Sequence, residues 1–132
     1  MSKKFKLITS LDQGGVLDST VIINKRLKKK GYKSSVIKVD KSKKKIVNKI
    51  NHGDYVILQM SGYGYHKKGI PIWLIEQIKL IKKKAFKIGI HFHELNIEKK
   101  FWDPRFILMI LQKYINIKLL KYSDFSVTSN KI

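Results

Sequence analysis

The sequence has 132 residues, enough for one domain with a real hydrophobic core, and no cysteine, which excludes disulfides and thiolate metal sites. Its net charge is +20, yet all but two of its 29 basic residues are lysines, the exceptions being Arg26 and Arg105. Because arginine is the better residue for phosphate forks and base edges, a solvated lysine coat is the first interpretation, an anionic membrane surface the second, and nucleic acid is less favoured.

The first part of the chain predicts strand, helix, strand and a short helix in turn. Residues 5–10 and 33–39 are short runs rich in β-formers. The helix between them ends at Gly31, and the lysine-rich segment 40–51 has only a thin apolar face. In the first helix, Leu17, Val21, Asn24 and Leu27 fall at helical spacing, and Val16, Ile22 and Ile23 widen the stripe.

The second part of the chain continues the alternation. Strands are predicted over 54–60, 86–92 and 124–129, with helices over 71–84 and 104–121 between them. Pro71 and Pro104 suit the first positions of these helices, and Asp103 suits the cap of the second. The faces expected to be buried carry Leu74, Ile75, Ile78 and Ile81 in the first helix and Ile107, Ile110, Leu111, Tyr114 and Leu120 in the second.

This alternation predicts right-handed βαβ units and a parallel sheet. We expect residues 1–132 to form a single α/β domain, a Rossmann-like three-layer fold with about five parallel strands in the order 3-2-1-4-5 and helices on both faces. In such sheets ligands bind at the carboxyl ends of the strands, so the loops after the first, third and fourth strands are the candidate binding loops. No apolar stretch of 18 residues occurs, so no segment is expected to cross a bilayer.

Two of these loops have unusual composition. Gly14 and Gly15 precede the first helix, where they either let a ligand approach the backbone or form a plain tight turn. No G-x-G-x-x-G fingerprint occurs, and Ile70 stands where a P-loop requires lysine. Glycine and tyrosine alternate from Gly62 to Tyr65, which is an uncommon connection between a strand and a helix.

The fourth strand ends in the sequence HFHEL. His91 and His93 are two residues apart, so on a strand their side chains point the same way. With Glu94 they offer metal-ligand chemistry, but the helical spacing of H-E-x-x-H is missing and no third histidine lies close in sequence. We therefore predict no metal at this position.

Taken together, GYGYHKKGIPIWL (62–74), HFHEL (91–95) and the segment FWDPRFILMILQKYINIKLLKYSDFSVTSN (101–130) resemble the N-terminal half of family 4-like glycosyltransferases with the GT-B fold. The resemblance covers about residues 5–130. It implies that this domain holds a glycan or lipid-linked acceptor, whereas a C-terminal domain, which this sequence lacks, holds the nucleotide-sugar donor. No separate cofactor is implied.

The resemblance also implies roles for individual residues. His93 matches a histidine that reaches the donor sugar, as the catalytic residue. Gly14 and Gly15 match a glycine loop near the donor phosphates and the acceptor. Tyr63, Gly64 and Tyr65 would line the acceptor side, and Glu94 completes the substrate-binding set. The chain alone is expected to be inactive: a fragment, a truncated frame, or a subunit whose partner chain supplies the donor domain.

Two further expectations concern partners and location. The resemblance implies a cytoplasmic location, peripheral at the inner face of the membrane. Helices 71–84 and 104–121 also combine apolar stripes with lysines, which either dock on anionic lipid or merely solvate the outside. The alternative function is a non-enzymatic basic α/β module that binds nucleic acid or a nucleotide.

Overall fold

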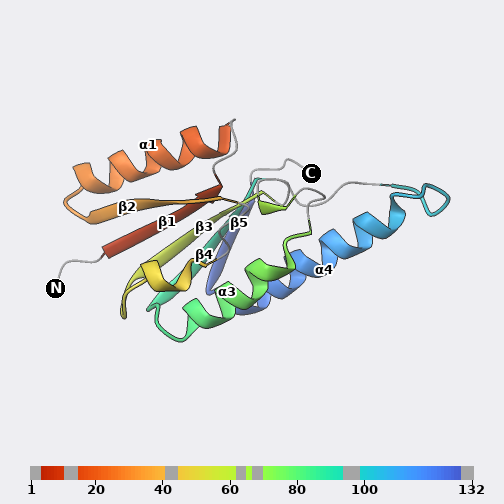
Figure 1. The fold of residues 1–132 in the computed structure, drawn as a ribbon. Helices are drawn as coiled ribbons and strands as arrows, with labels where there is room; N and C mark the ends of the chain where they lie inside the picture. Colours follow the sequence, from red (N-terminus) through yellow and green to blue (C-terminus); the bar gives the residue numbers. More distant parts are fainter. Residues whose placement is uncertain are drawn as a thin grey trace.

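The computed structural model describes residues 4–10, 15–40, 45–61, 65–66, 70–93 and 99–128, and it has three layers (Figure 1). Its elements are β1 (Lys4–Ser10), α1 (Gly15–Lys29), β2 (Lys33–Val39), the 3-10 turn η1 (Val47–Lys49), β3 (Tyr55–Met60), α3 (Ile72–Lys82), β4 (Lys87–Phe92), α4 (Phe106–Tyr122) and β5 (Phe125–Thr128). The five strands form one all-parallel sheet, with α1 on one face and α3 and α4 on the other (Figure 1). The predicted Rossmann-like α/β fold is confirmed.

The predicted strand order 3-2-1-4-5 is wrong, because the strands lie in the order β2-β1-β3-β4-β5. The burial of each strand explains the difference. β3 has no exposed residue, whereas β2 alternates between exposed and covered positions over most of its length. A strand covered on both faces belongs in the middle of a sheet, so β3 pairs with β1 and leaves the lysine-containing β2 at the edge.

The main hydrophobic core lies between the sheet and α3, α4 and η1. From α3 it receives Leu74, Ile78 and Ile81, which are fully buried as predicted, while Ile75 is partly buried. β3 contributes Val56, Leu58 and Met60, and β4 contributes Ile88, Ile90 and Phe92, the alternate residues that share this face. Burial of a contiguous apolar face of this kind is the dominant favourable term in folding.

The turn after α1 is the one that the sequence predicts. Gly31 has a φ of +92°, in the left-handed region that glycine adopts at low cost. Its N–H donates to the Lys28 carbonyl at 3.0 Å, and the Tyr32 N–H donates to the Leu27 carbonyl at 3.1 Å. These two bonds form a Schellman motif, which ends the helix and starts β2.

Segment 40–51 contains less helix than predicted. Among its described residues, 40 and 45–51, the only helical turn is η1. The Gln77 side-chain carbonyl of α3 accepts hydrogen bonds from the backbone N–H groups of Ile46 and Val47 at 2.8 and 3.1 Å. Ile46 and Ile50 are both buried in the main core, so the thin apolar face is used although no full helix forms.

The predicted buried face of α4 is also wrong. The side chains predicted to be buried are exposed: Ile107, Ile110, Leu111, Tyr114 and Leu120. The helix instead buries Met109, Gln112, Ile115, Asn116 and Leu119. α4 is apolar on nearly every side, so its periodicity gives no unique inward face, and packing against α3 and β4 selects one that includes two amides.

Asp124 fixes the start of the edge strand β5. Its carboxylate accepts the Ile88 N–H at 2.7 Å and the Lys82 ammonium at 3.1 Å, and its own N–H donates to the Ile88 carbonyl at 2.7 Å. The Ile88 hydrogen bond, followed by the Lys82 contacts, holds the pKa of Asp124 below its ordinary value. One residue therefore ties β5 to β4 and to α3.

We expect Asp124→Ala to lower the free energy of unfolding by about 1 kcal/mol at pH 7, the usual size of a partly exposed charge-assisted hydrogen bond. Because the folded-state pKa is depressed, this contribution is present above about pH 4 and is lost as the pH falls through the folded-state pKa. Urea unfolding at pH 7 and at pH 2.5 measures both effects. Lys82→Ala, which leaves the Ile88 bond in place, should cost less, and an equal loss would contradict the assignment.

Candidate functional site

The sheet opens between β1 and β3 at its carboxyl edge. Pairing of β1 with β3 extends only to Ile8 and Leu58. On either side the ladders continue further, to Ser10 in the β1–β2 pair and to Met60 and Phe92 in the β3–β4 pair. The strand order reverses at this same place, since β2 lies on one side of β1 and β3 on the other. This is the switch point at which open parallel sheets bind ligands.

Tyr65 closes the core side of this opening. Its hydroxyl donates to the Gln59 carbonyl at 2.8 Å and lies 3.4 Å from the Ile8 carbonyl, so it serves backbone oxygens of both separating strands. The Trp73 indole N–H donates to the Tyr65 carbonyl at 3.1 Å, with the two rings edge to face. Burial raises the pKa of Tyr65 far above its ordinary value, so the phenol stays protonated and keeps donating.

The structure therefore places Tyr65 in the core and not on a pocket wall. Its side chain is 1% exposed, which leaves no ring face on the surface for a sugar to stack against. What the ring does here is to anchor the end of the Tyr-Gly loop between β1 and β3. Tyr63 and Gly64, the other residues predicted to line the acceptor side, lie outside the described residues.

Gln59 and His93 form a polar pair on the opposite face of the sheet, the face that carries α1. The Gln59 side chain is fully buried, and its side-chain oxygen contacts the His93 Nε2 at 2.5 Å. The His93 backbone N–H donates to the Met60 carbonyl at 2.9 Å, which continues the β3–β4 ladder by one bond. These two contacts fix both the backbone and the ring of the predicted catalytic histidine.

His91 stands beside His93, as their alternate spacing predicts. The two ring centroids are 4.0 Å apart, with the planes tilted by 38°. Burial lowers the pKa of His91, which favours the neutral imidazole. With His91 neutral, the two adjacent imidazole rings can donate and accept hydrogen bonds without the repulsion that two cations would have.

A groove of about 160 Å³ runs along this face beside the histidines. It is lined by Ile23, Ile57, Gln59, Ile90, His91, Phe125 and Val127. Within the described part of the chain the Gln59 side-chain nitrogen is buried and has no hydrogen-bond partner. A buried amide donor left unpaired is costly, so this position is unusual within the sheet.

Gly89 shapes one wall of the groove. A Cβ built at this position would lie 2.1 Å from the end of the Phe125 ring, which shows that the ring lies directly over the glycine. Gly89 and Phe125 are register partners on β4 and β5, so a small residue on one strand accommodates a large one on the next. Phe125 thus gives the groove an aromatic wall.

The other predicted site residues are only partly placed. Gly15 begins α1, and the start of this helix lies over the carboxyl ends of the strands (Figure 1). His93 follows β4 at the same edge. Gly14 and Glu94 lie outside the described residues, so convergence of the whole set remains a prediction. Among the described residues no group of three or more potential ligands is placed to hold a metal ion.

Gln59 is the residue that sequence reasoning missed. The signal was present, because Gln59 is the single strongly polar side chain in the otherwise apolar run YVILQM of β3. A polar residue at the carboxyl end of a buried strand needs a partner, and here the partner is the histidine on the neighbouring strand. Together the groove offers amide and imidazole groups beside aromatic and aliphatic walls, which suits a neutral polar ligand such as a sugar.

We expect Tyr65→Phe to lower the free energy of unfolding by about 1–2 kcal/mol, because it removes the donor to the Gln59 carbonyl and the polar neighbour of the Ile8 carbonyl. Chemical denaturation at neutral pH measures the loss. Tyr114→Phe is the matched control, since that ring is 52% exposed on α4, and it should leave stability unchanged. Equal stability of all three proteins would remove the bridging role of Tyr65.

No protein-family model matches the chain, and no curated protein matches it significantly. The fold is established by the parallel sheet and its topology. The chemistry of the site must be argued from its own residues.

Proposed function

We propose that this chain is the acceptor-side half of a GT-B glycosyltransferase, which transfers a sugar from a nucleotide-sugar to a glycan or lipid-linked acceptor. The observation that supports it most is the Gln59–His93 pair at the carboxyl ends of β3 and β4, beside a groove over β3, β4 and β5 of a parallel sheet. The motif resemblance in the loops around β3 and β4 supports the same function. The donor site would be completed by a C-terminal domain, in the same protein or in a partner chain.

In this proposal His91, which lines the groove, binds hydroxyl groups of the substrate, and His93 acts at the reacting sugar. The Gln59 side chain orients the His93 ring through its Nε2 contact. Phe125 supplies an aromatic wall, which suits the apolar face of a sugar ring. Tyr65 has a positioning role, since it holds the neighbouring loop from inside the core.

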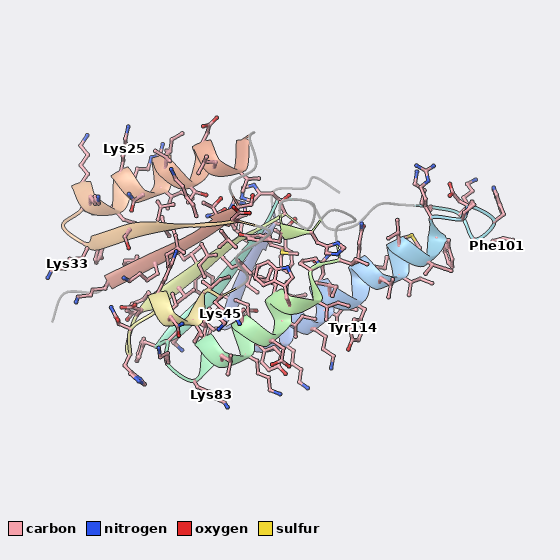
Figure 2. The ribbon with its side chains drawn as sticks, viewed as in Figure 1. Lys25, Lys33, Lys45, Lys83, Phe101 and Tyr114 are labelled. Atoms are coloured by element: carbon pink, nitrogen blue, oxygen red, sulfur yellow. The ribbon has the colours of Figure 1, made fainter. Side chains whose placement is uncertain are left out.

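The net charge of +20 is the one observation that favours the alternative, a module that binds nucleic acid. Figure 2 shows Lys25 on α1, Lys33 on β2 and Lys83 just after α3 on different sides of the domain. These labelled lysines do not gather into one groove, which favours a solvated coat over a site for a phosphate backbone. A salt series with random DNA tests the point: binding by the coat alone should disappear between about 50 and 200 mM salt.

The histidines provide an internal test of the groove. The chain has four, at positions 52, 66, 91 and 93. During titration with simple glycosides and nucleotide-sugars, the NMR ring signals of His91 and His93 should shift, while those of His52, in the turn that precedes β3, should not. Gln59→Leu should abolish the shifts and keep the fold. Shifts at His52 alone, or none at any histidine across the sugar panel, would contradict a sugar site in this groove.

We expect negligible sugar transfer by residues 1–132 alone and transfer when a donor domain of this enzyme class is supplied. Holding the donor against the acceptor contributes several kcal/mol to lowering the barrier, and half a cleft cannot do this. In the assembled enzyme His93→Ala should lower kcat by about a hundredfold or more. Robust turnover of a nucleotide-sugar by the isolated chain would refute the half-enzyme proposal.

A further inference from the structure

The outward side of α4 is an apolar surface that no described part of the chain covers. Ile107, Ile110, Leu111, Tyr114 and Ile117 recur at intervals of three and four residues, so they share one side of the helix. Each is exposed, with exposed fractions from 38% to 68%. The side that packs on α3 and the sheet is different and is already filled by other residues. We call these five side chains the outer stripe.

The turn before α4 extends this surface. Phe101 and Trp102 are 77% and 67% exposed, and their rings pack edge to face at 5.1 Å. Figure 1 shows the first turns of α4 projecting beyond the sheet, and Figure 2 places Phe101 at the outer tip of this projection. Two large aromatic rings held in water at the end of a protruding helix are costly unless something binds them.

Basic residues surround the outer stripe. Between positions 99 and 122 the chain has one acidic residue, Asp103, which pairs locally with Arg105, and five lysines. The lysines are Lys99, Lys100, Lys113, Lys118 and Lys121. The Lys100 ammonium lies 5.2 Å from the Trp102 ring, and the Lys118 ammonium lies 5.7 Å from the Tyr114 ring. Charge and apolar surface are thus interleaved on one side of the helix.

We propose that the outer stripe, with Phe101 and Trp102, docks on an anionic lipid bilayer. Aliphatic side chains and aromatic rings would enter the boundary between headgroups and acyl chains, and the surrounding ammonium groups would pair with lipid phosphates. A second copy of the chain fits this surface poorly, because it would bring two proteins of charge +20 together. No helix among the described residues is long and apolar enough to cross a membrane, so α4 would lie in the plane of the surface.

Docking involves α4 alone and not α3, although both helices combine lysines with apolar residues. α3 buries Leu74, Ile78 and Ile81 in the core, so its stripe is already used. The docking surface does not depend on the proposed sugar transfer, since it shares no residue with the groove.

Vesicle co-sedimentation at physiological salt tests the proposal, using phosphatidylcholine alone and phosphatidylcholine with phosphatidylglycerol. The chain should bind only the anionic vesicles. The double variant Phe101→Ala/Trp102→Ala, and separately Ile110→Ser/Ile117→Ser, should weaken binding about tenfold or more, since each buried apolar side chain contributes substantially to partition. The matched control Ile22→Ser/Ile72→Ser removes exposed apolar groups from α1 and α3 and should leave binding unchanged.

Lysine variants distinguish docking of α4 on the bilayer from general attraction of a basic protein to anionic lipid. Lys113→Gln/Lys118→Gln and the control Lys25→Gln/Lys28→Gln remove the same charge from α4 and from α1. Only the α4 pair should weaken binding strongly. Equal losses from both pairs, equal binding to neutral vesicles, or no binding at all would overturn the proposal. Self-association of the chain that is lost in the Phe101/Trp102 variant would also overturn it, because the surface would then be an interface between copies.

Trp102 gives a second readout that does not depend on comparing variants. The chain has two tryptophans, and Trp73 is partly buried, so Trp73→Phe leaves Trp102 as the single reporter. Its emission should shift to the blue with anionic vesicles and be quenched by brominated acyl chains. Binding without a shift would place Trp102 outside the membrane and contradict the proposed orientation. Circular dichroism confirms that each variant is folded.

Discussion

The separation of β1 from β3 beyond Ile8 and Leu58 is the constraint on which the rest of the site depends. Two parallel strands that part inside a sheet leave backbone carbonyls without ladder partners, and buried carbonyls need donors. The Tyr65 hydroxyl supplies one from the core side. On the other face, the side chain of Gln59, one residue beyond the last β1–β3 pair, reaches His93. Core packing and site geometry therefore have a common origin.

Much of the fold can be read from local sequence patterns. Each predicted strand appears within about one residue of its expected position, because apolar runs bounded by glycine, proline or charged residues depend on nearby sequence alone. Strand order cannot be predicted from local patterns. It depends on which strand is covered on both faces, and that requires comparing the burial of β2 with that of β3. The inward face of α4 could not be predicted from the sequence either, because the helix is apolar on most sides. Packing against neighbouring elements determines which side is buried.

Of the candidate site, the meeting of two histidine rings was predictable, but their partners were not. The alternate spacing of His91 and His93 predicts two neighbouring rings at the carboxyl end of β4, and the structure has them there. The contact of His93 with Gln59 joins residues 34 positions apart and follows from strand register, which the sequence does not state. Tyr65 is a residue whose burial the sequence does not predict. A tyrosine in a glycine-rich loop suggests a surface ring, yet this ring is buried in the core and its hydroxyl donates to a backbone carbonyl.

The two edges of the sheet are chemically unlike. β2 carries exposed Lys33 and Lys38, and charged side chains of this kind discourage pairing with another strand. β5 spans four residues without a charge, and Phe125 and Val127 are more than half exposed. The outer N–H and C=O groups of β5 are therefore the ones to which another strand could pair. Growth by strand addition, whether productive or as aggregation, would proceed in one direction only, away from β2.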